Sequence, residues 1–169
     1  MLRTHGITKN PDLLEKNEGG WYYEMQELGY NYRITDFQAA LAMSQLERAD
    51  ANMAKRKAIA KRYDEAFSNK NVILQKQEDG FSNAFHLYVI KVEDRKGLYD
   101  HLRENGIFAQ VHYIPVHTMP YYTQFGWKKG DFPKAEAYYD KCLSIPMYPN
   151  LTEEEQQYVI DRILEFTDK

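Results

Sequence analysis

The chain has 169 residues and a formal net charge of −3, with acidic and basic residues mixed along its length. This balance disfavours nucleic-acid binding, which calls for a basic face, and the single cysteine, Cys142, excludes an intrachain disulfide and suits a reducing compartment. No apolar run is long enough to span a bilayer, and residues 1–10 lack a signal-peptide core, so we expect a cytoplasmic protein without membrane contact.

Residues 1–34 lack a sustained apolar period and predict mostly loop. Within them, the segment Gly29-Tyr30-Asn31-Tyr32-Arg33 places Asn31 and Arg33 two residues apart, on the same side of an extended chain. Their amide and guanidinium groups suit a phosphate or a carboxylate. The sequence leaves open the alternative that both side chains satisfy loop backbone and a surface acid.

Residues 35–67 carry the strongest helical period of the chain. Thr35 followed by Gln38 forms a capping box, which fixes where the helix starts. Unbroken, the segment would reach on the order of 50 Å. We therefore expect one long helix that bridges two domains.

Residues 68–169 predict a small α+β domain, an antiparallel or mixed sheet with helices on one face. His86 falls inside the first predicted strand, where we expect a packed, hydrogen-bonded histidine. Thr152 and Glu155 form a second capping box, which opens the last helix. The remaining predicted elements are strands at 84–92 and 108–113, a short extended run at 143–145, and helices at 96–104 and 131–141.

His112, Tyr113 and His117 lie where the second predicted strand ends and a proline-containing loop begins. Ligand-contacting side chains concentrate in such places, so these residues are candidates for contact with a sugar or a phosphate. A metal site is disfavoured because no carboxylate or third histidine falls at a metal-ligand spacing. A purely structural role is the remaining interpretation.

The residues alone predict a binding surface built from loops, without a complete catalytic set. Cys142 and Ser144 have no local base that would activate a nucleophile. Neither common type of glycine-rich phosphate loop occurs. Residue types and spacing therefore name no reaction.

Several motifs occur along the chain in a familiar order: Leu2-Arg3-Thr4-His5-Gly6-Ile7, Gly29-Tyr30-Asn31-Tyr32-Arg33, Phe37-Gln38-Ala39-Ala40, Gln45-Leu46, Arg56, Tyr63, Ala84-Phe85-His86-Leu87-Tyr88 and Val111-His112-Tyr113-Ile114-Pro115. Together they resemble the DegT/DnrJ/EryC1/StrS family of nucleotide-sugar aminotransferases. The resemblance implies an α/β protein, the C-terminal part of a type I aminotransferase fold that uses pyridoxal 5'-phosphate (PLP). Residues 1–34 would be the tail of the large cofactor domain, 35–67 the bridging helix and 68–169 the small C-terminal domain.

Within the family, residues 23–29 and 110–113 are most similar to the branch that serves pseudaminic-acid biosynthesis. This similarity implies transfer of an amino group from glutamate, which becomes 2-oxoglutarate, to C4 of a UDP-linked 4-keto-6-deoxy-N-acetylhexosamine. An enzyme of the same family that acts on another dTDP- or UDP-linked keto-sugar is one alternative. A non-catalytic, truncated dimerisation or binding module is the other.

The resemblance also implies a homodimer with active sites shared between subunits. Asn31 would donate to the cofactor phosphate of the partner subunit, and Arg33 would hold a nearby anion, either the donor carboxylate or the sugar diphosphate. His112, Tyr113 and His117 would line the nucleotide-sugar pocket. The family's Schiff-base lysine is expected upstream of this chain, because no lysine here has the family's sequence context.

Overall fold

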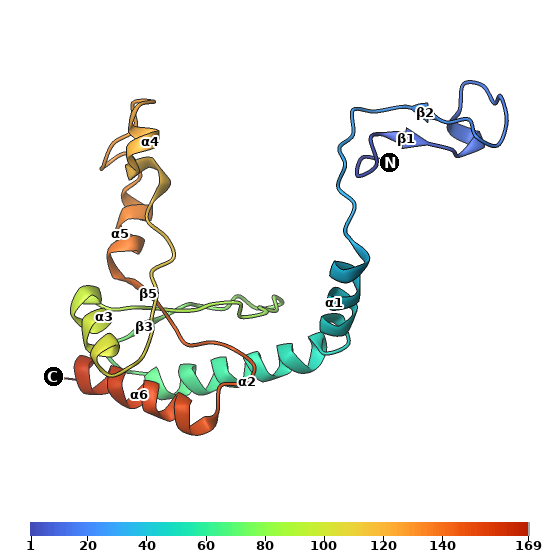
Figure 1. Ribbon diagram of the computed structural model, residues 1–169. Helices are drawn as coiled ribbons and strands as arrows, with labels where there is room; N and C mark the ends of the chain where they lie inside the picture. The colour runs from blue at the N-terminus through green and yellow to red at the C-terminus, as the bar shows by residue number, and fades with distance from the viewer. Residues whose placement is uncertain (169) are drawn as a thin grey trace. The chain divides into compact units, whose positions relative to one another are not determined.

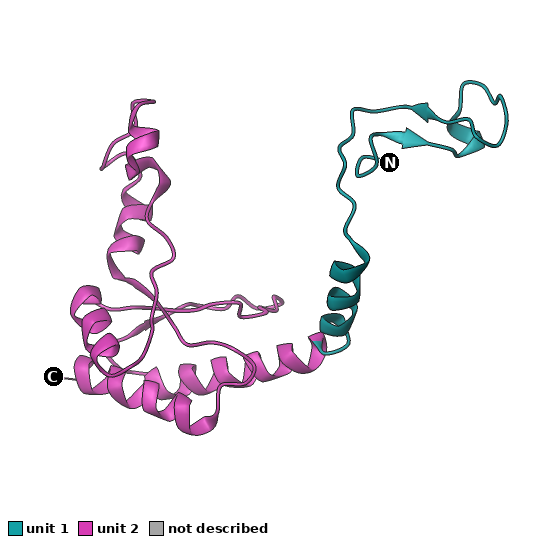
Figure 2. Ribbon diagram, in the orientation of Figure 1, with its two compact units in different colours: residues 1–48 teal, residues 49–169 magenta. Residues whose placement is uncertain are grey.

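The computed structural model describes residues 1–168, which form two compact units divided after Arg48 (Figure 2). Figure 1 labels the α-helices and most of the strands, which are numbered in chain order. The first unit contains β1 (Ile7–Thr8), η1 (Pro11–Leu13), β2 (Glu24–Met25) and α1 (Asp36–Leu46). The second unit contains α2 (Ala49–Phe67), β3 (Ile73–Leu74), β4 (Tyr88–Lys91), α3 (Arg95–Glu104), η2 (Val116–Thr118), α4 (Pro120–Thr123), α5 (Pro133–Lys141), β5 (Cys142–Ile145) and α6 (Glu153–Thr167).

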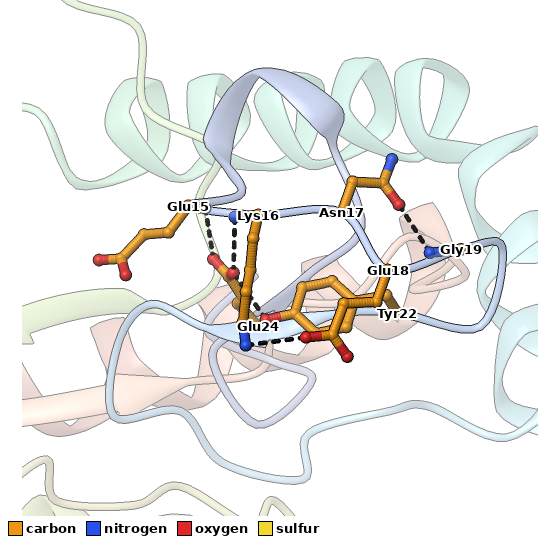
Figure 3. Close-up of polar contacts among 7 residues, drawn as sticks. All are labelled: Glu15, Lys16, Asn17, Glu18, Gly19, Tyr22 and Glu24. Carbon is orange, nitrogen blue, oxygen red and sulfur yellow. Dashed lines mark hydrogen bonds and ion pairs between the residues drawn. The ribbon is translucent and has the colours of Figure 1, made fainter.

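The first unit is held by backbone and carboxylate hydrogen bonds. β1 and β2 pair antiparallel, with Ile7 opposite Met25. The loop between them closes on Glu24, whose carboxylate accepts from the Glu15 N–H at 2.8 Å and from the Tyr22 hydroxyl at 2.9 Å (Figure 3). The N–H of Glu15 lowers the pKa of Glu24, while burial and this carboxylate raise the pKa of Tyr22 to about 12. One ionised side chain thus organises the part of this loop that follows η1.

The single long helix expected over 35–67 is wrong, because α1 ends at Leu46 and α2 begins at Ala49. In an unbroken helix, the Arg48 N–H would donate to the Ser44 carbonyl. Here the Arg48 side chain takes that acceptor, with Nε 3.2 Å from the Ser44 oxygen. The Arg48 N–H donates to the Gln45 carbonyl instead. The regular helical hydrogen bonds therefore end where the Arg48 side chain competes with its own N–H for the Ser44 carbonyl.

The second unit contains a three-stranded antiparallel sheet in the order β3-β4-β5. Helix α6 packs against both α2 and α3, and α3 also contacts β5. The helices and the sheet share one hydrophobic cluster, so the α+β prediction for this part of the chain is confirmed. Its fully buried large apolar side chains come from α2, β4, α3, β5 and α6, and they are Tyr63, Phe67, Ile90, Leu98, Leu102, Leu143 and Ile163.

Local hydrogen bonds set the starts of α1 and α6 as predicted. Both capping boxes are present, Thr35 with Gln38 at α1 and Thr152 with Glu155 at α6. Asp94 caps α3 by accepting from the Gly97 N–H at 2.8 Å. The helices predicted at 96–104 and 131–141 are α3 and α5, with starts that differ by one or two residues.

The strand predicted at 84–92 is shorter, and β4 covers only Tyr88–Lys91. Asn83 accepts from the Phe85 N–H at 2.8 Å, and Phe85 has a positive φ of 48°, so the chain bends before the strand. His86 consequently precedes β4 and is exposed. The expectation of a packed histidine within the strand is wrong.

The strand predicted at 108–113 is also wrong, because only Gln110 pairs with the sheet. Its N–H and carbonyl both bond to Ser144, at 3.0 and 2.7 Å. At His112, two residues after Gln110, the ring contacts the Ser144 hydroxyl instead of the backbone pairing with the strand.

In the described part of the chain, no helix combines the length and apolar character of a membrane span.

Candidate functional site

Backbone hydrogen bonds hold the segment Gly29–Arg33 against the start of the chain. The Tyr30 N–H donates to the Leu2 carbonyl and the Tyr32 N–H to the Arg3 carbonyl, both at 2.9 Å. A bridge between Thr4 and Asn31 continues this pairing. The segment is therefore extended and fixed through its backbone, which leaves its side chains available.

Two glycines allow this close pairing. A Cβ on Gly29 would lie 2.0 Å from the Gly6 nitrogen, and one on Gly6 would lie 1.7 Å from the Glu27 carbonyl oxygen. Gly6 also has a positive φ of 71°, a conformation that residues with a Cβ rarely adopt. A side chain at Gly6 or at Gly29 would therefore clash with the paired backbone, which explains the glycine at both positions of the family-like motifs.

Asn31 and Arg33 share one side of the extended segment, as their spacing predicts. The rings of Tyr30 and Tyr32 stack with centroids 5.2 Å apart, so these two side chains occupy one side. Alternation then directs Asn31 and Arg33 to the other. Both are exposed, and among residues 1–168 neither side chain makes a hydrogen bond or an ion pair. Their donors face solvent and suit an anion.

In the second unit, His112 and Tyr113 lie together beside β5. The half-buried His112 ring has its Nδ1 2.8 Å from the Ser144 hydroxyl oxygen. The Tyr113 ring meets the His112 ring edge-on, with centroids 4.7 Å apart, and is 72% exposed. Ser144 orients the histidine, while the tyrosine presents an aromatic face to solvent.

His117 occupies a different environment from the one expected for a substrate contact. It is buried, its Nε2 lies 2.8 Å from Glu136 Oε1, and its ring packs edge-on against Phe132. Glu136 also accepts from the Gly130 N–H at 2.7 Å, and the bond with His117 lowers the pKa of this carboxylate. His117 therefore ties η2 to α5, which favours the structural interpretation for this residue.

Two residues that the sequence did not predict hold other groups in place by hydrogen bonds. Ser144 was considered only as a nucleophile, yet it holds His112. Arg56, part of the family-like pattern, donates from Nη1 to the carbonyls of Phe85 at 2.9 Å and Met147 at 3.1 Å. No local signal predicted these pairings, because the partners are far apart in sequence. Within residues 1–168, no three potential metal-ligating side chains gather.

Comparisons with known proteins cover nearly the whole chain. The profile of the DegT/DnrJ/EryC1/StrS aminotransferase family matches residues 1–164. The spore coat polysaccharide biosynthesis protein SpsC of Bacillus subtilis is 38% identical over 96% of this chain and 44% of its own length. The UDP-4-amino-4,6-dideoxy-N-acetyl-beta-L-altrosamine transaminase of Campylobacter jejuni is 32% identical over 100% of this chain and 44% of its own length.

The fold is also that of solved relatives. Spr1654 from Streptococcus pneumoniae, in its PLP form, matches with a TM-score of 0.82 and 27% identity. That match covers 99% of this chain and 42% of Spr1654. The chain thus spans less than half the length of the relatives that it matches.

Proposed function

The chain belongs to the DegT/DnrJ/EryC1/StrS aminotransferase family, and from that premise we propose that it is the C-terminal part of a PLP-dependent nucleotide-sugar aminotransferase. The proposed reaction transfers an amino group from glutamate to C4 of a UDP-linked 4-keto-6-deoxy-N-acetylhexosamine. The similarity of the entire chain to the C. jejuni transaminase carries this proposal. Residues 1–34 would belong to the large cofactor domain, 35–67 would connect the domains, and 68–169 would form the small one.

The free donors of Asn31 and Arg33 fit the phosphate of PLP. Both side chains are exposed on one side of a segment whose backbone is already paired. In the proposed homodimer, Asn31 donates its amide N–H to the cofactor phosphate of the partner subunit, and Arg33 holds the donor carboxylate or the sugar diphosphate. When bound, PLP supplies an electron sink for moving the amino group.

In the second unit, His112 and Tyr113 are the residues that would contact the sugar. Ser144 fixes the His112 ring through Nδ1, which leaves Nε2 to donate to or accept from a sugar hydroxyl. The exposed Tyr113 ring offers a flat surface and a hydroxyl for the same ligand. His117 has no place in this proposal, because Glu136 already binds it.

The role of Asn31 is tested in the full polypeptide that contains this chain. Asn31→Ala should weaken PLP retention about tenfold, because it removes a hydrogen bond to a charged phosphate, with no change in thermal unfolding of the apoprotein. Asn17→Ala is the matched control, since among residues 1–168 the Asn17 side chain bonds only within its own loop, where it accepts from the Gly19 N–H (Figure 3). Equal PLP affinity in the two variants would rule out the phosphate role.

The substrate class is tested by turnover with glutamate and either UDP-linked or dTDP-linked 4-keto-sugars. We expect preference for the UDP-linked sugar. Another keto-sugar is the second candidate, because identity to SpsC, at 38%, exceeds the 32% identity to the altrosamine transaminase. For this chain alone, PLP and borohydride should label no single lysine, since we propose that the Schiff-base lysine lies outside it.

A further inference from the structure

Strand β5 presents two of its side chains to the face of the sheet that carries His112. Leu143 and Ile145 belong to the shared hydrophobic cluster. Because side chains alternate along a strand, Cys142 and Ser144 point to the opposite face. There the Cys142 sulfur lies 3.9 Å from the His112 carbonyl oxygen, and the Ser144 hydroxyl oxygen lies 2.8 Å from the His112 ring. This face of β5 therefore contacts both the backbone and the side chain of His112.

The backbone of Ser144 is held from both sides of β5. Its register partner in the sheet is Val89 of β4. On the other side, its carbonyl and its N–H bond to the backbone of Gln110. The residue is only 5% exposed. Its hydroxyl therefore has a fixed position, as a group that orients a functional side chain requires.

The Ser144 hydroxyl has one hydrogen-bond partner among residues 1–168, which is His112 Nδ1. A neutral imidazole carries its hydrogen on either Nδ1 or Nε2. If Nδ1 carried it, Nδ1 would donate to Ser144, and the hydroxyl hydrogen would be buried without an acceptor. Such donors are rare, because they lose their bond to water and gain none in return. The network therefore assigns the hydroxyl as donor, Nδ1 as acceptor and the imidazole hydrogen to Nε2.

The Nε2 atom of His112 is accessible from solvent. It makes no hydrogen bond within residues 1–168. In the same range, the one buried side-chain nitrogen or oxygen without a partner is Arg162 Nε. The unpartnered Nε2 of the half-buried His112 ring is therefore not buried, and its hydrogen is free for a ligand.

We propose that Ser144 is a positioning residue for the sugar nucleotide: its hydroxyl keeps the imidazole hydrogen on Nε2, so that His112 binds the sugar as a hydrogen-bond donor. The identity of the ligand rests on the proposed function. The bound atom is a carbonyl or hydroxyl oxygen of the sugar, because Nε2 offers a hydrogen and no lone pair. Ser144 acts only through His112, since its own hydroxyl is buried and its hydrogen is already used.

The hydrogen positions are measured in the full chain by nitrogen–proton correlation NMR of the imidazole rings at about pH 8, above the ordinary histidine pKa of about 6.5. His112 should show a protonated Nε2 and an unprotonated Nδ1. His101 is the internal reference, because its Nε2 lies 3.1 Å from the Arg162 carbonyl oxygen, an atom that only accepts. A hydrogen on His112 Nδ1 would overturn the inference.

Ser144→Ala removes the donor and should shift the His112 Nδ1 resonance, whereas the His101 resonances stay unchanged. Ser144→Thr keeps a hydroxyl and should return the resonance toward its position in the unchanged chain. Ser68→Ala is the matched control, since Ser68 is exposed and its hydroxyl bonds only to Asn69 among residues 1–168. Equal His112 spectra in Ser144→Ala and the unchanged chain would refute the hydrogen bond.

Kinetics of the full polypeptide separate positioning from a merely structural role. Ser144→Ala should raise the KM for the sugar nucleotide about fivefold, as the loss of one hydrogen bond does, and leave kcat within about twofold. Ser144→Thr should recover the KM, and Ser68→Ala should not change it. An unchanged KM in Ser144→Ala overturns the positioning role. A polypeptide with the assigned His112 hydrogen but no turnover of UDP-linked keto-sugars refutes the proposed reaction and leaves the assignment standing.

Discussion

Arg56 connects three distant parts of the second unit through one guanidinium. It starts from α2 and donates to the Phe85 carbonyl before β4 and to the Met147 carbonyl after β5. Half-buried carbonyls that lose such a donor are left without a partner, which is costly when water cannot replace it. The arginine of the family-like pattern therefore has a structural explanation that is independent of any ligand.

Arg56→Gln should lower the free energy of unfolding by about 2 kcal/mol, because a shorter neutral side chain cannot replace the charged hydrogen bonds. Chemical denaturation measures this change. Lys61→Gln, in the exposed pair with Glu65 on the same helix, is the control and should change stability by less than about 0.5 kcal/mol. A similar, small loss in both variants would contradict the connecting role.

The pair of His117 and Glu136 predicts a pH dependence. The hydrogen bond from His117 lowers the pKa of Glu136 below its ordinary value of 4.5. A carboxyl group with a lowered pKa contributes stability that is complete above its ordinary pKa and lost as the pH falls through the lowered one. The contribution of Glu136 should therefore disappear in acid.

This dependence is measured as the difference in Tm between the unchanged chain and Glu136→Gln. The unchanged chain should be more stable at neutral pH, and the difference should shrink as the pH falls below 4.5. Glu65→Gln, an exposed control, should show little difference across the range. A difference for Glu136→Gln that grows on acidification would be incompatible with a lowered pKa.

At the scale of the elements, two capping boxes of the same design have different surroundings. The α6 box opens a helix that buries Gln156, Val159, Ile160 and Ile163 in the shared core, whereas α1 buries no residue. The N-terminus of α6 should therefore unfold together with the core, whereas the N-terminus of α1 should not.

Thr152→Ala should lower the global stability by about 1 kcal/mol, as the loss of a helix cap does. Thr35→Ala removes an equivalent cap and should leave the main unfolding transition unchanged, with only local loss of helicity in α1. Circular dichroism during denaturation distinguishes the two variants. An equal shift of the main transition would show that α1 unfolds together with the core.

At the scale of the whole molecule, burial is concentrated in the second unit. All buried hydrophobic residues of the described chain lie in the range 59–163. In the first unit the only buried residue is Gly6, and large apolar side chains such as Trp21, Leu28 and Phe37 are more than 70% exposed. The first unit has its hydrogen bonds but no hydrophobic core.

Hydrogen exchange of the chain should follow this division. Amides in α2, β4 and α6 should be protected, whereas those in residues 1–35 should exchange rapidly, because local opening there exposes little apolar surface. Mass spectrometry after timed exchange measures both. Protection of residues 1–35 comparable with that of α6 would contradict the prediction.

The sequence predicted the features that depend on neighbouring residues. The capping boxes at Thr35 and Thr152 involve partners three positions away, and the apolar period of α6 lies within one element. The spacing of Asn31 and Arg33 likewise set their common side. The extent of the strands was not predicted, because Gln110 pairs only once with Ser144 and Phe85 bends the chain before β4.

The sequence by itself thus determined the capped starts of α1 and α6, the α+β character and, through its ordered motifs, the family. Only the tertiary structure decided which histidine is available to contact a ligand. Ser144 orients the half-buried His112 ring, whereas His117 is buried and bound by Glu136. The physical reason is that caps and helical periods arise from contacts within a few residues, whereas these pairings form only when the packed core brings distant segments together.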